Sequence, residues 1–549
     1  MGKRILLVLA LAGVVAATTA GQARSAPRQA PAGDYVVLYA NGASLASARL
    51  AVRAAGGTIV RENTAVGVAT ATSVDPRFEA AAGTQAALAG VARNMPVGRA
   101  TSLRAPAHPS RAKAPRVRAA AAAEPLAGLQ WDMAMMGATV NGSYAREPGK
   151  RGVLVGILDT GVDGTHPDLA PNFDRGLSRN FVTDMPDIDG ACEHPSCVDP
   201  VDEDDDGHGT HVAGIVGAAL NGLGTAGVAP NVTLVNIRAG QDSGFFFLQP
   251  TVDALTYAAD VGVDVVNMSY FIDPWLYNCA NNPADSPQAQ LEQRTIIAAT
   301  QRALDYASAH GVTLVAALGN ENTNLDSPSI VDTTSPDFPD GAAYTRTVDQ
   351  SCVDLPTEGR HVIAVGAVGP STMKADYSNW GLKQNDVTAP GGWFRDGFGT
   401  PTFRTDGNEI LSTYPTALAL TDPRVDADGT PNDPSVVRDC RNGVCAYYQY
   451  LQGTSMASPH AVGVAALIVS RFGVRDVRHG GLTLPPAAVE AIMRTMATDH
   501  ACPNPPTISY AREGRGPEFD AVCTGTTQRN SIWGDGIVNA LASVTLHKQ

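Results

Sequence analysis

The sequence of 549 residues lacks long apolar runs: beyond its N-terminus, no stretch approaches the roughly 18 apolar residues that a membrane span requires. Aromatic residues are scarce, at 6%, and no basic stripe is interleaved with them, so we expect no nucleic-acid partner. Apolar residues nevertheless reach 44%, with 55 Gly and 37 Pro, which argues against a disordered, collagen-like or coiled-coil chain. The composition predicts a globular protein of more than one domain.

The first residues have the pattern of a secretory signal peptide. Two cations, Lys3 and Arg4, are followed by an apolar run over residues 5–17 and then by small residues up to Ala23. The run is too short to cross a membrane, so we predict a signal peptide over residues 1–23 and a secreted protein without membrane contact after cleavage. Arg outnumbers Lys by 34 to 6, which indicates a GC-rich bacterial genome, and we expect a Gram-positive source.

Charge is unevenly divided along the chain. The net charge is −14, yet residues 1–123 hold 15 basic and 4 acidic side chains, whereas the remainder holds 25 basic and 50 acidic ones. A basic front part of +11 therefore precedes an acidic body of −25. This split predicts either two parts that attract each other or a basic tail for another partner.

All eight cysteines lie in the acidic body. Their even number, together with export, predicts up to four disulfides, and the absence of any C-x-x-C pair argues against a zinc site. Proximity in the sequence favours three local pairs and leaves one distant pair, although other connectivities stay open. The favoured pairs are Cys192–Cys197, Cys440–Cys445, Cys502–Cys523 and Cys279–Cys352.

Three segments follow the signal peptide. Residues 34–98 show short β-rich and helical patterns that predict a small α+β unit, and residues 99–123 shift to Ala, Pro and Arg, which predicts a linker without a core. From residue 124 to 549, short apolar strands alternate with helices, which predicts an α/β fold whose parallel sheet is covered by helices on both faces. Strands are expected at 153–158, 233–237, 263–268, 312–317 and 362–365, and helices at 210–220, 251–261 and 296–310.

Three motifs in the body carry the groups of a nucleophilic enzyme. Asp159 ends an apolar strand in Val-Gly-Ile-Leu-Asp-Thr-Gly, at the edge where open α/β sheets place their sites. His208 opens a helix in His-Gly-Thr-His-Val-Ala-Gly, and Ser455, in Gly-Thr-Ser-Met-Ala-Ser-Pro-His, falls in the first turn of another helix. Each motif alone is typical of a turn or a helix start, but together they supply acid, base and nucleophile.

With these three motifs, the chain from about residue 130 to 540 resembles the subtilisin-like serine proteases, the subtilase family. The resemblance implies that Ser455 attacks the peptide carbonyl, that His208 takes and returns its proton, and that Asp159 orients the imidazole. It implies a monomeric endopeptidase that acts on protein or peptide substrates and requires no cofactor for its chemistry. The stretch 534–540 resembles the family's last helix.

The resemblance also assigns substrate-binding positions. Asn320 ends another strand and is expected to donate to the tetrahedral oxyanion together with the backbone N–H of Ser455. Phe271 and Leu318 stand where smaller residues are usual in the family; either they narrow the cleft, our hypothesis, or Phe271 simply packs inward. Substrate contacts are expected from Ser269, Tyr270, Phe271, Ala317, Leu318 and Gly319.

The resemblance implies a structural calcium ion held by Asp168 and Asn221. A second acidic feature, the Asp-x-Asp-x-Asp run over residues 202–206, covers half of an EF-hand loop, but its twelfth position is Ala213 instead of Glu. We interpret this run as a solvated acidic loop.

Other classes of function fit less of the sequence. Asp159-Thr-Gly and Asp242-Ser-Gly could form an aspartic-protease pair, but that interpretation leaves His208 and Ser455 without a role. His208 and His211 lack the intervening Glu of an H-E-x-x-H zinc motif. A catalytically inactive binding module gains no support, because no catalytic position is substituted.

The resemblance also suggests a function for the basic front part. Residues 34–98 resemble a subtilase propeptide that acts as an intramolecular inhibitor and folding aid, and we expect the mature enzyme to begin between Arg116 and Leu129. Insertions at residues 178–205, 270–295 and 415–450 lie near the predicted cleft. With these insertions near the cleft, two roles stay open: general protein digestion and the dedicated processing of one secreted peptide precursor.

Overall fold

The computed structural model describes residues 33–100, 124–190, 192, 194–196, 198–271, 274–337 and 341–548. The predicted signal peptide and most of the predicted linker lie outside these residues. No helix within the described ranges is long and apolar enough to cross a membrane.

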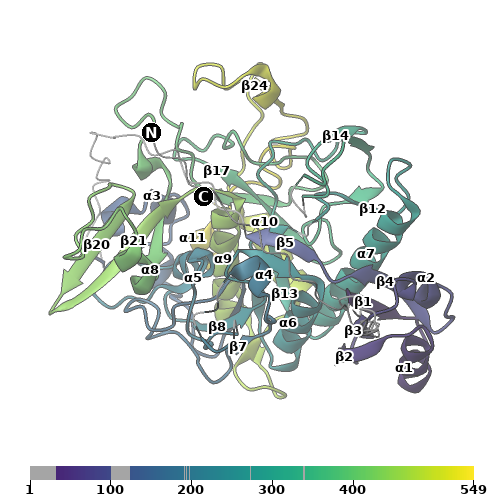
Figure 1. Cartoon of the computed structure of the whole chain (residues 1–549). Helices are drawn as coiled ribbons and strands as arrows, with labels where there is room; N and C mark the ends of the chain where they lie inside the picture. The colour runs from purple at the N-terminus through teal and green to yellow at the C-terminus, as the bar shows by residue number, and fades with distance from the viewer. Residues whose placement is uncertain are drawn as a thin grey trace, which may run out of the picture.

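A seven-stranded parallel sheet forms the centre of the body (Figure 1). Its residues are nearly all buried and apolar, because a parallel sheet is covered on both faces. The predicted α/β fold is therefore confirmed. In spatial order the strands are β18 (Val387–Pro390), β17 (Val362–Val368), β13 (Thr313–Ala317), β10 (Val265–Met268), β6 (Leu154–Leu158), β8 (Thr233–Arg238) and β7 (Arg179–Asn180).

Consecutive residues of the strands point into different cores. Val265 belongs to the core that holds α5 (His208–Gly217) and α9 (Thr454–Phe472), whereas Val266 belongs to the core that holds α6 (Leu248–Asp260) and α7 (Pro287–Ala309). This alternation follows from the two-residue period of a strand and places two helices on each face of the sheet.

Two more helices cover the first face, α10 (Pro486–Met496) and α11 (Ala540–Thr545), since both contribute to the core of α5 and α9. The last helix begins at Ala540, so the expectation of a helix over 534–540 is wrong except for that residue. Gly536, at φ +124, stands in a backbone conformation that favours glycine and not a helix.

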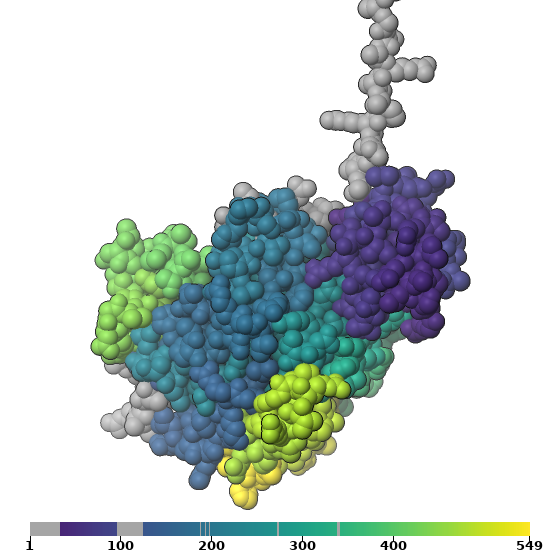
Figure 2. Space-filling view, turned by 90° about the horizontal axis from the view of Figure 1, so that it is seen from below, coloured from purple at the N-terminus to yellow at the C-terminus, as the bar shows by residue number. Residues whose placement is uncertain are grey.

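The N-terminal unit is a four-stranded antiparallel sheet with two helices, seated against α6 and α7 (Figures 1 and 2). Val37 packs inside the unit, while its neighbours Val36 and Leu38 join the core of α6 and α7. The unit contains β1 (Gly33–Tyr39), α1 (Leu45–Ala54), β2 (Thr58–Asn63), β3 (Val68–Ser73), α2 (Phe78–Gly83) and β4 (Leu88–Arg93).

The strand β5 (Pro96–Ala100) leaves this unit and enters the body (Figure 1). It lies between β9 (Phe245–Phe247) and β11 (Tyr270–Phe271) and runs antiparallel to both, with Ala100 opposite Tyr270. A continuous segment of the chain thus occupies the middle of a three-stranded sheet whose two edges belong to the body.

Three of the four expected disulfides are formed, Cys279–Cys352, Cys440–Cys445 and Cys502–Cys523. Cys197, of the fourth expected pair, lies outside the described residues. The remaining short elements are α3 (Trp131–Met135), α4 (Pro186–Asp189), β12 (Asn278–Cys279), β14 (Ile330–Asp332), β15 (Arg346–Val348), β16 (Cys352–Val353), β19 (Ile410–Tyr414), α8 (Thr416–Thr421), β20 (Val436–Arg441), β21 (Val444–Leu451), β22 (Val474–Arg475), β23 (Leu482–Thr483), β24 (Thr507–Ile508) and β25 (Ala521–Val522).

Candidate active site

Asp159 and His208 meet at the carboxyl edge of the sheet. Asp159 follows the last residue of β6, His208 is the first residue of α5, and Nδ1 of His208 lies 2.7 Å from Oδ1 of Asp159. Both side chains are buried. Burial alone lowers the pKa of His208, but the carboxylates of Asp159, Asp206 and Asp204 outweigh it and raise that pKa above its usual value.

The acidic run before His208 is built into the fold, so the interpretation as a solvated loop is wrong. Asp204 is only 4% exposed, and its carboxylate accepts hydrogen bonds from Thr160 Oγ1, the Gly207 N–H, and the N–H and hydroxyl of Thr210. It satisfies free N–H groups at the start of α5 and connects them to the end of β6. The run is therefore a fixed support for the Asp159–His208 pair.

Close backbone approach explains the glycine after His208. A Cβ atom on Gly209 would lie 2.1 Å from the carbonyl oxygen of Gly161, in the turn that follows Asp159. Only glycine allows α5 to begin this near to the end of β6.

Ser455 lies in the first turn of α9, as the sequence predicts, beside the end of β10. Its Oγ donates to the carbonyl oxygen of Ser269 at 3.2 Å, and Ser269 Oγ donates to the carbonyl oxygen of Ser455 at 2.9 Å. In the described part of the chain, Nε2 of His208 has no hydrogen-bond partner. Catalytic hydrogen bonds often tighten only when substrate is bound, so the direction of the Ser455 hydroxyl in this structure does not argue against its role as nucleophile.

The side chain of Asn320 is held from one side. Its Oδ1 accepts hydrogen bonds from the N–H and the hydroxyl of Thr454, at 2.9 and 3.0 Å, and the Thr454 hydroxyl oxygen accepts from the Gly319 N–H at 3.1 Å. This fixed oxygen orients the amide group at the residue that precedes Ser455. An amide donor held in this way is what stabilisation of an oxyanion requires.

Two of the six expected substrate contacts pair with β5, and the other four lie at the ends of β10 and β13. Tyr270 and Phe271 pair with β5 directly, and the Tyr270 ring stacks on Phe246 at a centroid distance of 4.1 Å. Leu318 is fully buried and shares an apolar cluster with the partly buried Phe271. Ser269, Ala317 and Gly319 complete the two strand ends around Ser455 and Asn320.

Asp168 and Asn221 lie together and are hydrogen-bonded to each other. Asn221 Nδ2 donates to Asp168 Oδ1 at 3.2 Å, and the Tyr448 hydroxyl donates to Asp168 Oδ2 at 2.7 Å. Calcium binds oxygen ligands, and the carboxylate of Asp168 and the buried carboxylate of Glu124 nearby are groups of that kind. Burial raises the pKa of Asp168 to about 7, although the hydrogen bond from Tyr448 lowers it. Whether the protein binds calcium stays a prediction.

Within the described ranges, Asp199, Asp205 and Asp242 form a group whose oxygens all lie within 4.8 Å of one another. The buried guanidinium of Arg238 lies 2.8 Å from Asp199 and also contacts Asp242. Because Arg238 already supplies a positive charge there, we assign no metal to this group. Asp242 pairs with Arg238 and Asp159 with His208, so the two do not form an aspartic-protease dyad.

His211 has a structural role. Its Nε2 contacts the carbonyl oxygens of Ile410 and Gln449, at 3.2 and 2.9 Å. Burial lowers the pKa of His211 to about 3, so the ring is neutral.

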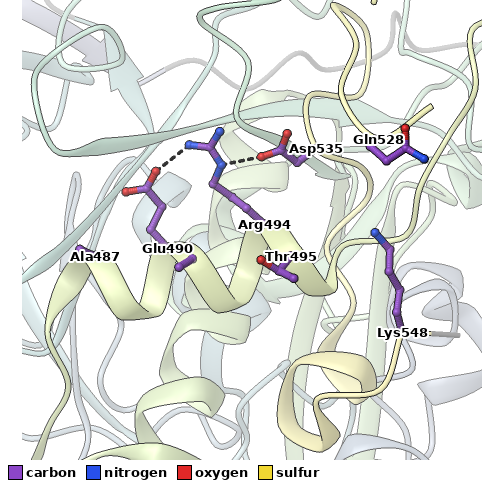
Figure 3. A pocket seen from close by; sticks show the side chains of 8 residues that line it. Ala487, Glu490, Arg494, Thr495, Gln528, Asp535 and Lys548 are labelled. Carbon is purple, nitrogen blue, oxygen red and sulfur yellow. Dashed lines mark hydrogen bonds and ion pairs between the residues drawn. The ribbon is translucent and has the colours of Figure 1, made fainter. Parts of the chain in front are cut away.

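A separate depression of about 530 Å³ lies between α10 and the C-terminal segment (Figure 3). Arg494 lies between Glu490 and Asp535, with N–O distances of 2.7 and 2.6 Å. The charge of Arg494 is thus paired within the depression, and that of Lys548 is paired with Asp499 outside its lining. None of the residues that line the depression was expected in the site.

Sequence reasoning missed the roles of Asp204, Asp206 and Tyr448. The regular spacing of acidic residues before His208 was the only signal for the first two. Tyr448 comes from the hairpin of β20 and β21, far along the chain from Asp168, and no motif marks it.

Comparison with known proteins identifies relatives of this arrangement. The model of the subtilase family, Peptidase_S8, matches residues 150–516. The chain is 29% identical to subtilisin DY of Bacillus licheniformis over 58% of this chain and 77% of that protein. It is 30% identical to the nisin leader peptide-processing serine protease NisP of Lactococcus lactis subsp. lactis, over 63% of this chain and 44% of that protein.

Solved structures agree in fold. The epidermin leader peptide processing serine protease EpiP of Staphylococcus aureus superposes with a TM-score of 0.62 at 21% identity, covering 94% of this chain and 99% of that one. Fervidolysin of Fervidobacterium pennivorans superposes with a TM-score of 0.57 at 20% identity, covering 96% of this chain and 62% of that one.

Proposed function

The chain belongs to the subtilase family and is a serine endopeptidase, and from that premise we propose that it is secreted as a self-inhibited precursor and works through Asp159, His208 and Ser455. The observation that carries the assignment of these residues is the 2.7 Å contact between Asp159 and His208, with Ser455 at the start of α9. Its substrates are proteins or peptides, and we propose that it works as a monomer.

Each residue has a defined part in the proposed mechanism. Ser455 Oγ attacks the scissile carbonyl while Nε2 of His208 takes its proton and later returns it to the leaving amine. Asp159 holds Nδ1 of His208 and stabilises the imidazolium that forms. Asn320 and the backbone N–H of Ser455 donate to the oxyanion of the tetrahedral intermediate.

Self-inhibition is supported by the position of β5. This strand adds itself between β9 and β11, the β-augmentation by which extended peptides bind to sheet edges. Because β5 continues directly from the N-terminal unit, that unit would keep a substrate from the same edges until it is cut away. We retain the proposal that the mature enzyme begins between Arg116 and Leu129, which mass spectrometry of the secreted protein would test.

Ser455→Ala tests the proposed mechanism. We expect it to remove peptide hydrolysis and to leave an uncut chain with an unchanged circular dichroism spectrum. Ser470→Ala is the matched control, because Ser470 lies in the last turns of the same helix, where it binds the Lys150 N–H. Hydrolysis by Ser455→Ala at the rate of the control would overturn the assignment.

Processing of a specific peptide precursor is a second candidate for the physiological role. Two of the relatives, NisP and EpiP, are named as leader peptide processing proteases. Profiling cleavage sites in a proteome-derived peptide library would decide between the two roles: a long required motif indicates processing, and a short loose one indicates general digestion.

A further inference from the structure

Three carboxylates lie behind the strand end that leads to Asn320: Glu321, Asp354 and Glu358, here called the acidic set. Asp354 is only 1% exposed, and neither of its carboxylate oxygens has a hydrogen-bond partner in the part of the chain that the structure describes. Its charged neighbours within the same described part are Glu321 and Glu358. Burial raises the pKa of Asp354 far above its usual value, and the two neighbouring carboxylates raise it further.

The acidic set adjoins the predicted substrate contacts. Glu321 Oε2 accepts a hydrogen bond from Asn379 Nδ2 at 2.7 Å and lies 2.7 Å from the place that a Cβ atom of Gly319 would take. Although Glu321 is an exposed residue, its carboxylate therefore turns inward, toward the backbone of Gly319. On the Asp354 side, Thr357 Oγ1 donates to the carbonyl oxygen of Ala317 at 2.5 Å.

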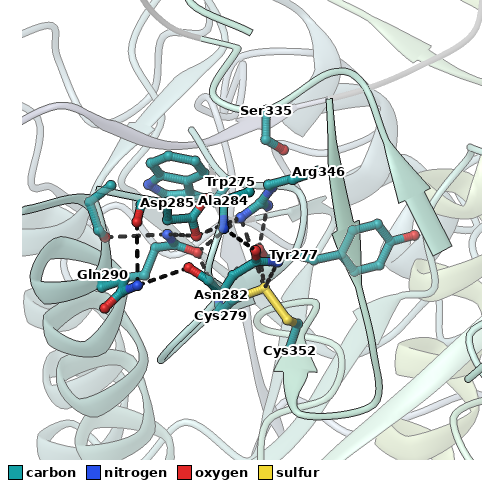
Figure 4. Close-up of polar contacts among 12 residues, drawn as sticks. Trp275, Tyr277, Cys279, Asn282, Ala284, Asp285, Gln290, Ser335, Arg346 and Cys352 are labelled. Carbon is teal, nitrogen blue, oxygen red and sulfur yellow. Dashed lines mark hydrogen bonds and ion pairs between the residues drawn. A yellow bond between two sulfur atoms is a disulfide. The ribbon is translucent and has the colours of Figure 1, made fainter. Parts of the chain in front are cut away.

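Apolar groups lie next to this acidic end. Leu318, Tyr277 and the partly buried Phe271 belong to one cluster, together with the disulfide Cys279–Cys352. Figure 4 shows the Tyr277 ring turned away from the polar contacts around Arg346. Burial raises the pKa of the Tyr277 hydroxyl, and the nearby carboxylates of Glu321 and Asp354 raise it further. An apolar wall that ends in carboxylates suits a long aliphatic stem with a cationic head.

Arg346, a buried cation that contacts Tyr277 and Cys279 of the same cluster, is already paired with other carboxylates. Arg346 lies 3.3 Å from Asp285 and 2.9 Å from Asp332, and its guanidinium stacks over the ring of Trp275 at 4.7 Å (Figure 4). It therefore neutralises its own two carboxylates and leaves Asp354 uncompensated. Ionising buried carboxylates without a counter-charge is costly, which is why the pKa of Asp354 is raised. A cation placed beside these carboxylates would remove that cost and favour their ionised form.

We propose that the acidic set binds the cationic head of an Arg or Lys side chain immediately before the scissile bond, with Asp354 as the main determinant of this preference. The inference rests on the proposed function, because it places that side chain by reference to Ser455 and Asn320. In the described residues, the group of three acidic side chains compact enough for one metal ion is Asp199, Asp205 and Asp242. The acidic set is more widely spread, which fits a guanidinium or ammonium group better than a metal ion.

The chain itself offers such side chains. Its predicted linker contains basic residues at Arg104, Arg111, Lys113, Arg116 and Arg118. A cut after either of the last two would start the mature enzyme within the interval proposed above. A preference for basic residues would also replace the hypothesis of a narrowed cleft that favours small side chains.

The test compares peptides that differ only in the residue before the scissile bond: Arg, Lys, citrulline, Ala and Phe. Citrulline keeps the shape of Arg without its charge. The full chain is expressed, and the active enzyme that it yields is titrated with a serine-directed acylating reagent. We expect kcat/KM for Arg to exceed that for citrulline about 100-fold or more, because a buried carboxylate left without its cation is penalised.

Asp354→Asn should reduce the Arg-to-citrulline ratio to within a few-fold of one, and Glu321→Gln should reduce it partly. Asp264→Asn is the matched control, because Asp264 is a buried carboxylate that binds the Leu154 N–H away from the acidic set. The control should keep the full ratio. If Asp354→Asn does not fold, the Arg-to-citrulline ratios of the wild type and of Glu321→Gln still test the proposal.

Three results would overturn the inference: citrulline, Ala or Phe cleaved as fast as Arg by the wild type, an unchanged ratio in Asp354→Asn, or a ratio that depends on added calcium and vanishes with a chelator. The last would identify a metal site. A wild type that cleaves neutral peptides without preferring Arg refutes this inference alone, whereas a chain whose hydrolysis does not depend on Ser455 refutes the proposed function.

Discussion

Asp253, on α6, is the residue through which the N-terminal unit can be loosened without touching the catalytic groups. Its Oδ2 lies 2.6 Å from Nε of Arg61, and its Oδ1 accepts a hydrogen bond from Nδ2 of Asn63 at 2.7 Å. Both partners belong to β2 of the N-terminal unit. Asp253→Ala removes an ion pair and a charge-assisted hydrogen bond from one interface.

The exposure of the two side chains sets how much binding free energy Asp253→Ala should remove. The Asp253 side chain is 11% exposed, but that of Arg61 is 32% exposed, so solvent screens part of the ion pair. Truncating one member of a buried pair costs about 2–5 kcal/mol, and exposed pairs contribute up to about 1 kcal/mol. An intermediate value of about 2 kcal/mol corresponds to roughly a 30-fold weaker association.

The assay adds the purified segment 33–100 to mature enzyme and measures the inhibition constant. We expect this constant to rise about 30-fold in Asp253→Ala. Asp260→Ala is the control, because Asp260 ends the same helix and binds the Tyr306 hydroxyl, away from the N-terminal unit. An inhibition constant within three-fold of the wild type in Asp253→Ala, or an equal rise in the control, would refute the reasoning.

Three more predictions follow from the contacts of individual residues. Asp206→Asn removes a carboxylate that raises the pKa of His208, so the acid limb of the pH profile of kcat/KM should move to lower pH; a limb that stays in place contradicts this. Tyr448→Phe removes a donor from the buried Asp168, and denaturant titration should show a free energy of unfolding lower by about 1–3 kcal/mol. Raising the salt concentration from 0.05 to 0.5 M should weaken inhibition by segment 33–100 no more than about five-fold, because surface charges are screened while hydrogen bonds are not; a hundred-fold loss would show that long-range attraction dominates docking.

The sheet was predictable because parallel strands leave a simple pattern. The apolar runs ending at Leu158, Met268 and Ala317 could be read directly, since a strand buried on both faces needs no polar alternation. Asp159 could be placed at a strand end for the same reason. The 2.7 Å contact of Asp159 with His208 could only be inferred from a family resemblance, because nothing local to either residue encodes it.

The acidic side chains were the part that local sequence misjudged. A run of charge indicates solvent exposure on average, yet Asp204 is buried because the start of α5 and the end of β6 both need hydrogen-bond acceptors. Asp354 carries no motif at all. It lies near Glu321 because Asp354 directly follows β16, which the disulfide Cys279–Cys352 joins to β12.

The negative charges of the body therefore act mainly on other residues of the body, and less on the basic N-terminal unit. Of the contacts between the N-terminal unit and α6, the ion pair that the structure describes is Arg61–Asp253, and Asn63 and Thr256 add an uncharged hydrogen bond at 2.7 Å. In the body, by contrast, the carboxylates of Asp204 and Asp206 raise the pKa of His208. We propose that the carboxylate of Asp354 binds a cationic side chain of the substrate. An acidic body explains the electrostatics of the catalytic base and of substrate choice better than it explains docking, because buried charges act on their neighbours far more strongly than exposed charges act across solvent.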